Sequence, residues 1–179
     1  AFLYNIGIQA YHLAIQLAAP FNEKAALLRK GRKEAEKAAG IQRGEGRLVW
    51  FHAASLGEFE QGRPVIEALK AAEPATQILL TFFSPSGYEI RKNYTGADYI
   101  LYLPGDTRRN AVRLIEKFRP DAAVFIKYEF WFHYLNELNK RNIPVYLISA
   151  IFRLSFIFGG FVLLAVSGSS SAPDVSVWA

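Results

Sequence analysis

Apolar and polar residues alternate in blocks along most of this chain, and the apolar blocks have the length of β-strands. Five short runs are almost wholly apolar, and they cover residues 48–54, 77–83, 97–103, 122–126 and 144–149. Strands that are apolar on both faces are typical of a parallel sheet covered by helices on both sides. The pattern therefore predicts five parallel strands.

The polar segments between these runs have the composition of helices. The first predicted helix begins near Gln61, and the helices end near Ala72, Tyr94, Phe118 and Arg141. Regular alternation of strand and helix favours the α/β class. We therefore expect a Rossmann-like doubly wound parallel sheet over residues 48–153.

The N-terminal segment, residues 1–21, is apolar and almost uncharged. A narrow polar stripe interrupts it at Asn5, Gln9, His12 and Gln16, and Pro20 ends it. No Lys or Arg precedes the apolar run, which argues against a secretory signal peptide. About 20 apolar residues are needed to span a bilayer, so the length is marginal. We predict a membrane-anchor helix, inserted or interfacial; the alternative is an amphipathic helix packed on its own domain.

The next segment, residues 22–47, carries the charge of the protein. Its excess of Lys and Arg over Glu from Lys24 onward equals the formal net charge of +5. A basic stretch directly after an apolar helix is expected on the cytoplasmic side of a membrane. We interpret it as a helical basic connector facing an anionic lipid surface rather than nucleic acid. The chain has no Cys, which excludes disulfides and thiolate metal sites.

The C-terminal segment, residues 154–179, departs from the α/β pattern. An apolar run from Leu154 to Val166 is too short to span a bilayer comfortably, and a Ser-rich stretch of low complexity follows. No further strand–helix unit can be recognised after Arg153. We expect this tail to be atypical sequence.

Ligands of an open parallel sheet bind beyond the carboxyl ends of its strands, at a topological switch point. Three segments rich in hydroxyl, Gly or charged residues fall at such ends: 55–58, 84–87 and 127–131. Glu58 follows Gly57 at a strand-to-helix turn, where a carboxylate can act as a general base on a hydroxyl nucleophile. The alternative is a structural Glu at a helix N-terminus, in a capping box with Ser55.

Glu129 lies among aromatic residues, a setting that suits contact with a carbohydrate or a polar headgroup. Its alternative role is an ion pair with Lys127 or with an Arg elsewhere. Ser84, Ser86 and Gly87 offer hydroxyl and backbone N–H groups to a phosphate. The sequence has no Walker loop, no G-x-G-x-x-G and no metal-ligand spacing. His12, His52 and His133 are scattered and are interpreted as structural, and Ser55 lacks a nucleophile elbow.

Four motifs together resemble one family, the 3-deoxy-D-manno-octulosonic acid (Kdo) transferases. They match it in order and spacing, and Ile148 to Arg153 continue the match. The motifs are His52-Ala-Ala-Ser-Leu-Gly-Glu58-Phe59, Leu80-Thr-Phe-Phe-Ser-Pro-Ser-Gly87, Leu103-Pro-Gly-Asp106 and Lys127-Tyr-Glu-Phe-Trp131.

The resemblance implies the N-terminal half of a GT-B fold, whose partner domain binds the donor CMP-Kdo. It implies an inverting, metal-independent transfer of Kdo to the lipid A precursor, lipid IVA, with no cofactor, on the cytoplasmic face of the inner membrane. Glu58 would be the general base. The implied acceptor-binding residues are Ser55, Gly57, Ser84, Ser86, Gly87, Lys127 and Glu129.

Two departures from the family pattern stand out. The family usually has Pro after the tryptophan of the E-F-W motif, where this chain has Phe132. The family pattern also ends after Arg153, so we expect the donor domain to be absent and this chain alone to be inactive. Two other functions fit parts of the pattern: a non-catalytic membrane-attached module that binds an anionic lipid headgroup, and a small soluble nucleotide-binding α/β domain.

Overall fold

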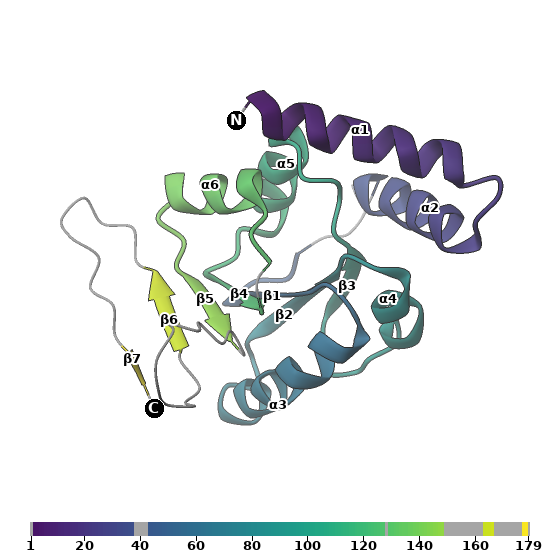
Figure 1. Ribbon diagram of the computed structural model, residues 1–179. Coiled ribbons are helices and arrows are strands. Elements are labelled where there is room, and N and C mark those ends of the chain that lie inside the picture. The colour runs from purple at the N-terminus through teal and green to yellow at the C-terminus, as the bar shows by residue number, and fades with distance from the viewer. Residues whose placement is uncertain (1, 38–42, 128, 149–162, 167–176, 179) are drawn as a thin grey trace, which may run out of the picture.

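The computed structural model describes residues 2–37, 43–127, 129–148, 163–166 and 177–178, shown as coloured ribbon in Figure 1. The helices are α1 (Phe2–Ala18), α2 (Glu23–Lys37), α3 (Leu56–Ala72), α4 (Pro85–Arg91), α5 (Arg108–Phe118) and α6 (Phe132–Lys140). The strands are β1 (Leu48–Ala53), β2 (Gln77–Phe82), β3 (Tyr99–Tyr102), β4 (Ala122–Ile126), β5 (Val145–Ile148), β6 (Leu163–Val166) and β7 (Val177–Trp178).

One sheet runs through the molecule in the order β3-β2-β1-β4-β5-β6-β7. The five predicted strands pair in parallel, and β6 and β7 add antiparallel at the edge next to β5. The chain builds outward from β1 to β3 and then returns to β4 on the other side of β1. The Rossmann-like doubly wound sheet is thereby confirmed, and its switch point lies between β1 and β4.

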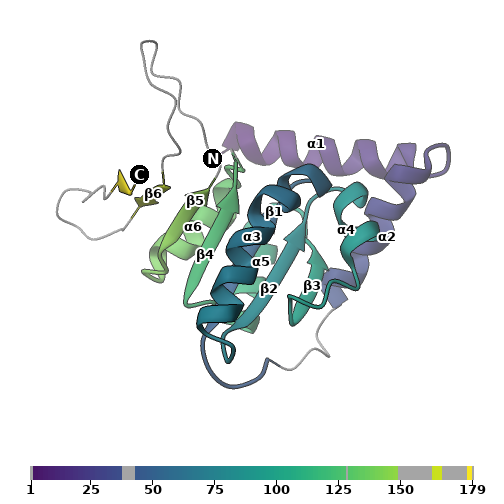
Figure 2. The same cartoon turned by 90° about the horizontal axis from the view of Figure 1, so that it is seen from below.

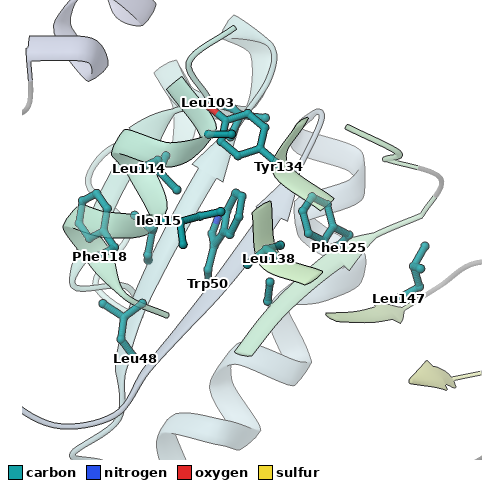
Figure 3. Packing of buried hydrophobic residues seen from close by; sticks show 13 residues of the cluster. Leu48, Trp50, Leu103, Leu114, Ile115, Phe118, Phe125, Tyr134, Leu138 and Leu147 are labelled. Atoms are coloured by element: carbon teal, nitrogen blue, oxygen red, sulfur yellow. The ribbon is translucent and has the colours of Figure 1, made fainter. Parts of the chain in front are cut away.

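Helices cover both faces of the sheet, which explains why the strands are apolar throughout. Helices α5 and α6 pack on one face, where Trp50 lies among Phe125, Tyr134 and Ile115 (Figure 3). Helix α3 packs on the other face through Phe59 and Ile66. All side chains of β1 are buried between these two layers of helices. The polar loops that follow the strands therefore start from a rigid core.

Helices α1 and α2 lie beside the sheet rather than apart from it. Helix α2 packs closely on β3, since a Cβ at Gly31 would lie 2.1 Å from the ring of Tyr102. Helix α1 crosses the edge of the sheet toward which the strand arrows point (Figure 2). Its Tyr11 ring stacks on Phe83, directly after β2, with ring centroids 6.1 Å apart. The helix predicted for the basic connector is thus present as α2, and the structure adds that this helix packs against β3.

Two details differ from the predictions. Helix α3 begins at Leu56 rather than near Gln61, because Ser55 and Glu58 form its N-terminal cap. Helix α4 ends at Arg91, earlier than predicted. The predicted tail, residues 154–179, lies outside the described residues except for the strands β6 and β7. Within the described part of the chain, no helix combines the length and the apolarity required to cross a membrane.

Candidate functional site

The loops that follow β1 and β4 meet at the switch point of the sheet. The two strands are neighbours, with His52 opposite Phe125 near their carboxyl ends. The first loop leads to Glu58 and the second leads to Glu129. The topology therefore brings the two carboxylates that the sequence singled out to the same edge of the sheet.

Glu58 lies in the first turn of α3 and is held by the start of its own helix. Its Oε2 accepts a hydrogen bond from the backbone N–H of Ser55 at 2.9 Å and one from the Ser55 hydroxyl at 3.3 Å. Ser55 is the N-cap, so the predicted capping box is present. Both of these bonds fall on Oε2 rather than on Oε1. Gly57 is exposed beside it, and a Cβ there would meet no neighbouring atom within 4 Å.

Glu129 is held by residues from other parts of the fold. Its Oε2 accepts a hydrogen bond from the indole N–H of Trp131 at 2.9 Å and lies 3.6 Å from Nε2 of His52. Its side chain is 17% exposed, so the carboxylate is mostly enclosed yet reachable. The ion pair with Lys127 that the sequence left open is not among the contacts of the described residues. Glu129 instead contacts an aromatic N–H and an imidazole.

Lys127 is the first residue after β4, and its backbone is strained. Its φ of 64° lies in the left-handed region, which costs a non-Gly residue about 1–2 kcal/mol. The backbone N–H of Lys127 still donates to the carbonyl of Ile148 at 2.8 Å, so the chain turns sharply directly after its last sheet bond. Strain of this kind is concentrated at functional sites, where the surrounding structure maintains it.

The Ser84–Gly87 loop lies at the end of β2 and starts the short helix α4. The hydroxyls of Ser84 and Ser86 are hydrogen bonded to each other at 2.7 Å. Gly87 is buried, and a Cβ there would lie 2.3 Å from the ring of Phe82. The glycine is therefore required by close packing, and the two hydroxyls are the groups that this loop presents to solvent.

A stack of aromatic rings connects the switch point to α1, a feature that the sequence analysis missed. Trp131 stacks on Phe83 with ring centroids 4.8 Å apart, and Phe83 in turn stacks on Tyr11. The guanidinium of Arg32 from α2 lies over the Phe83 ring at 4.7 Å. Each contact joins distant parts of the chain, so spacing in the sequence gives no signal for it.

Asp106 joins α1 to the start of α6. Its carboxylate is buried and accepts hydrogen bonds from the backbone N–H groups of His133 and Tyr134 and from the hydroxyl of Tyr4. Trp131 at the N-cap of α6 supplies no side-chain cap, so Asp106 takes that role. Burial and the bond to Asp106 raise the pKa of Tyr4, which therefore stays a proton donor.

The N-terminal helix reaches α6 at two further points. Nε2 of His133 lies 2.6 Å from Oδ1 of Asn5, within hydrogen-bond distance. The Tyr4 ring packs against Phe132 with ring centroids 5.5 Å apart. Phe132, which follows the tryptophan of the E-F-W motif, is the first helical residue of α6, a position at which Pro is common. Here that position contributes an aromatic contact with α1.

A groove of about 1090 Å³ opens between α1 and α2, and its lining reaches Gly105, the residue before Asp106. Its α1 wall carries the apolar side chains of Leu13, Ile15 and Leu17, and its α2 wall carries Arg29, Lys30, Arg32 and Lys33. Outside the groove α1 is also apolar, since Leu3 is 82% exposed, Ile6 51% and the following Phe21 91%. One surface thus combines exposed apolar and cationic groups.

The described residues include no group of three or more His, Asp or Glu side chains placed to hold a metal ion. The chemistry available at the switch point is that of carboxylates, hydroxyls, an ammonium and aromatic N–H groups. Such a set suits binding of a polyhydroxylated ligand and removal of a proton from one of its hydroxyls.

Comparison with known proteins identifies relatives of this chain in sequence. The 3-deoxy-D-manno-octulosonic acid transferase of Chlamydia trachomatis serovar D is 29% identical over 116 residues, which are 62% of this chain and 27% of the relative. The transferase of Aquifex aeolicus is 36% identical over 84 residues, 46% of this chain and 23% of the relative. That of Haemophilus influenzae is 29% identical over 103 residues, 57% of this chain and 24% of the relative.

The chain therefore spans about a quarter of the length of the curated relatives it matches. The family model described as 3-deoxy-D-manno-octulosonic-acid transferase (kdotransferase) matches residues 21–156, which include both switch-point loops. The chain belongs to this Kdo transferase family.

Proposed function

We propose that this chain forms the acceptor-binding half of a glycosyltransferase that moves Kdo from CMP-Kdo to the lipid A precursor, lipid IVA. The observation that carries the proposal is the meeting of the Glu58 and Glu129 loops, both from family motifs, at the switch point between β1 and β4. A ligand seated there contacts the carboxyl ends of the strands, as in other open α/β sheets.

In the proposed reaction, a hydroxyl of the acceptor sugar attacks the anomeric carbon of Kdo. The bond from that carbon to the phosphate of CMP breaks, and the phosphate keeps the bonding electrons. Glu58 takes the hydroxyl proton on Oε1, while Ser55 holds Oε2. Attack on the face opposite the leaving CMP inverts the anomeric centre, and the step as proposed uses no metal ion.

The acceptor is proposed to reach this site from the α1–α2 groove. Arg29, Lys30 and Lys33 would face its phosphates, and the apolar wall of α1 would face its acyl chains. Lys127, Ser84 and Ser86 lie at the strand ends, where they would contact the sugar headgroup. Each charge-assisted hydrogen bond of this kind contributes about 1.5–3 kcal/mol.

The activity is tested by joining this chain to the donor-binding half of a Kdo transferase relative. We expect this two-domain version to add Kdo to lipid IVA, followed by mass spectrometry. We expect the 179-residue chain by itself to bind lipid IVA without transferring Kdo, because one Rossmann-like domain does not bring both substrates together. A two-domain version that folds and turns over no lipid IVA would contradict the proposed function.

The proposed location is the cytoplasmic face of the inner membrane, with α1 lying in the interface. Apolar side chains on the outer face of α1 would enter the lipid, at about 1.5–3 kcal/mol for a fully buried Leu. The basic residues of α2 would add about 1 kcal/mol each at an anionic surface. The inner face of α1 is tied to α6 through Tyr4, so substitution of the outer face is a cleaner test than deletion of residues 1–21.

We expect a Leu3→Ser, Ile6→Ser, Phe21→Ser variant to lose most of its sedimentation with vesicles that contain phosphatidylglycerol. The matched control is Val65→Ser, Ile90→Ser, which removes exposed apolar side chains from α3 and α4. Equal sedimentation of the two variants would rule out α1 as the membrane contact.

A second function is favoured by the same groove: a non-catalytic module that holds an anionic lipid headgroup. It predicts the vesicle and lipid IVA binding above, and it predicts no transfer by the two-domain version. The activity assay therefore separates the two functions.

A further inference from the structure

His52 lies fully buried at the carboxyl end of β1, where its ring contacts β2 and the loop after β4. Its Nδ1 is 2.8 Å from the hydroxyl oxygen of Thr81 and 3.1 Å from the Thr81 carbonyl oxygen. Its Nε2 is 3.1 Å from the indole Nε1 of Trp131. Both ring nitrogens are thus engaged by groups from other elements.

These partners fix the tautomer of the imidazole. An indole N–H only donates, so Nε2 of His52 must accept from Trp131. A carbonyl oxygen only accepts, so the proton of the ring lies on Nδ1 and points toward Thr81. The Thr81 hydroxyl oxygen also accepts from the indole N–H of Trp50 at 2.8 Å, which anchors it in the core. His52 therefore presents an unprotonated Nε2 to the loop after β4.

The N–H of Trp131 is shared between two acceptors. It donates to Nε2 of His52 at 3.1 Å and to Oε2 of Glu129 at 2.9 Å, and the two acceptor atoms are only 3.6 Å apart. Without the shared proton, the two lone pairs would repel each other at this distance. The Trp131 ring is held in turn by its stack on Phe83. The side chain of Glu129 thus has a defined position because Trp131 and His52 define it.

We propose that His52 is a positioning residue for the acceptor site, acting on the carboxylate of Glu129 through the indole N–H of Trp131. This inference rests on the proposed function, because it takes Glu129 to be one of the residues that contact the acceptor sugar. His52 itself touches no substrate. Its part is to keep Trp131 in the orientation that leaves Glu129 directed toward the acceptor.

Two substitutions of His52 separate its two nitrogens. The amide of Gln reaches as far along the side chain as Nε2, so His52→Gln keeps an acceptor for Trp131. The amide of Asn reaches only as far as Nδ1, so His52→Asn keeps a partner for Thr81 and loses the one for Trp131. Trp131→Phe removes the indole N–H and so breaks the same link. Trp131 is only half-buried, so we expect this change to disturb the fold less than a change of the buried His52.

The kinetic test uses the two-domain version described above. We expect His52→Asn and Trp131→Phe to lower kcat/KM for lipid IVA by about 10- to 100-fold, as misplacement of a positioned group does. His52→Gln should recover most of this loss. A double variant, His52→Asn with Glu129→Gln, should be no slower than Glu129→Gln alone, because both changes disable the same group.

A spectroscopic readout checks the link itself in the 179-residue chain. The ¹⁵N–¹H indole signal of Trp131, assigned by its loss in Trp131→Phe, should shift in His52→Asn and return in His52→Gln. Effects of His52→Asn and Glu129→Gln that multiply, or an indole signal that does not respond to His52→Asn, would overturn the inference while the parent enzyme stays active. A parent that transfers no Kdo would overturn the proposed function, and this inference with it.

Discussion

Glu58 and Glu129 follow neighbouring strands, and they are held by different parts of the chain. The Glu58 carboxylate is fixed by Ser55, three residues earlier in the same turn. The Glu129 carboxylate is fixed by Trp131, whose indole N–H also bonds His52, 79 residues away in the sequence. One loop is organised locally and the other by tertiary contacts.

The same contrast applies to the helices that follow the two loops. Helix α3 begins with its own capping box, so its start is fixed by local sequence. Helix α6 has Trp131 at its N-cap and borrows the carboxylate of Asp106 for its N–H groups. A locally built loop keeps its geometry when distant parts shift. The start of α6 is linked to the position of α1, because the Tyr4 hydroxyl of α1 donates to the same Asp106 carboxylate that accepts from the N–H groups of α6.

The largest effect is expected from Glu58→Gln in the two-domain version. This change keeps the size of the side chain and removes its ability to take a proton. We expect kcat to fall by about 10²–10⁴-fold, with lipid IVA affinity nearly unchanged. Initial rates at saturating lipid IVA measure the loss of kcat, and the urea midpoint of the same variant measures any loss of stability.

Ser55→Ala is the matched control, since it removes the hydroxyl from the same capping box and leaves the carboxylate. Loss of a cap typically costs about 0.5–2 kcal/mol of stability. We expect Ser55→Ala to show that cost and a much smaller loss of turnover than Glu58→Gln, because the backbone N–H of residue 55 still holds Oε2. If Glu58→Gln keeps near-normal turnover, Glu58 is a structural cap and Glu129 becomes the candidate base.

A smaller effect is expected from Asp106→Ala, which tests the tertiary half of the comparison. The change leaves two buried N–H groups of α6 and the Tyr4 hydroxyl without their acceptor. We expect the free energy of unfolding to fall by about 2–6 kcal/mol, since each of the two unsatisfied buried N–H groups costs about 1–3 kcal/mol. Urea unfolding of the 179-residue chain measures it.

Thr107, the next residue, provides a local control. Its hydroxyl accepts from the N–H of Asn110 at 3.3 Å and caps its own helix, α5. Thr107→Ala should cost only about 0.5–2 kcal/mol. An Asp106→Ala variant no less stable than Thr107→Ala would mean that the start of α6 does not depend on the borrowed carboxylate.

The sequence could predict the features that arise from short-range pattern. The five apolar runs identified the parallel strands, because strands enclosed on both faces have no polar side. The spacing of Ser55 and Glu58 indicated the capping box, because both partners belong to one helical turn. The apolar pattern predicts the start of α3 too late in the chain, since the first turn carries Gly57 and Glu58 in place of apolar residues.

Other features require the folded chain. The sequence favours a structural role for His52, because a single histidine in an apolar strand has no local partner, whereas the structure places it against Trp131 and beside Glu129. The motif around Asp106 was recognised without a role, because its partners lie in α1 and α6. The sites and the domain boundaries assigned from the family resemblance stay predictions, which the variants described above test.

The smallest effect is expected at Lys127, where the loop after β4 holds strain that the loop after β1 lacks. Gly adopts the φ of 64° without a Cβ penalty, so Lys127→Gly should raise the free energy of unfolding by about 0.5–1 kcal/mol. The same variant should bind lipid IVA about tenfold more weakly, or about 1.4 kcal/mol, if the ammonium contacts the sugar headgroup of the acceptor. Urea unfolding and lipid IVA titration measure the two changes.

Two controls separate the strain from the charge at this position. Lys127→Ala removes the ammonium and keeps the strained backbone, so it should weaken binding by the same factor without the gain in stability. Arg119→Gly relieves a φ of 40° at the C-terminal end of α5, before β4 rather than after it, so it should stabilise the chain and leave binding unchanged. If Lys127→Gly binds lipid IVA as tightly as the parent, the strained residue has no part in the acceptor site, and its left-handed backbone serves only the sharp turn that leads the chain from β4 toward Trp131.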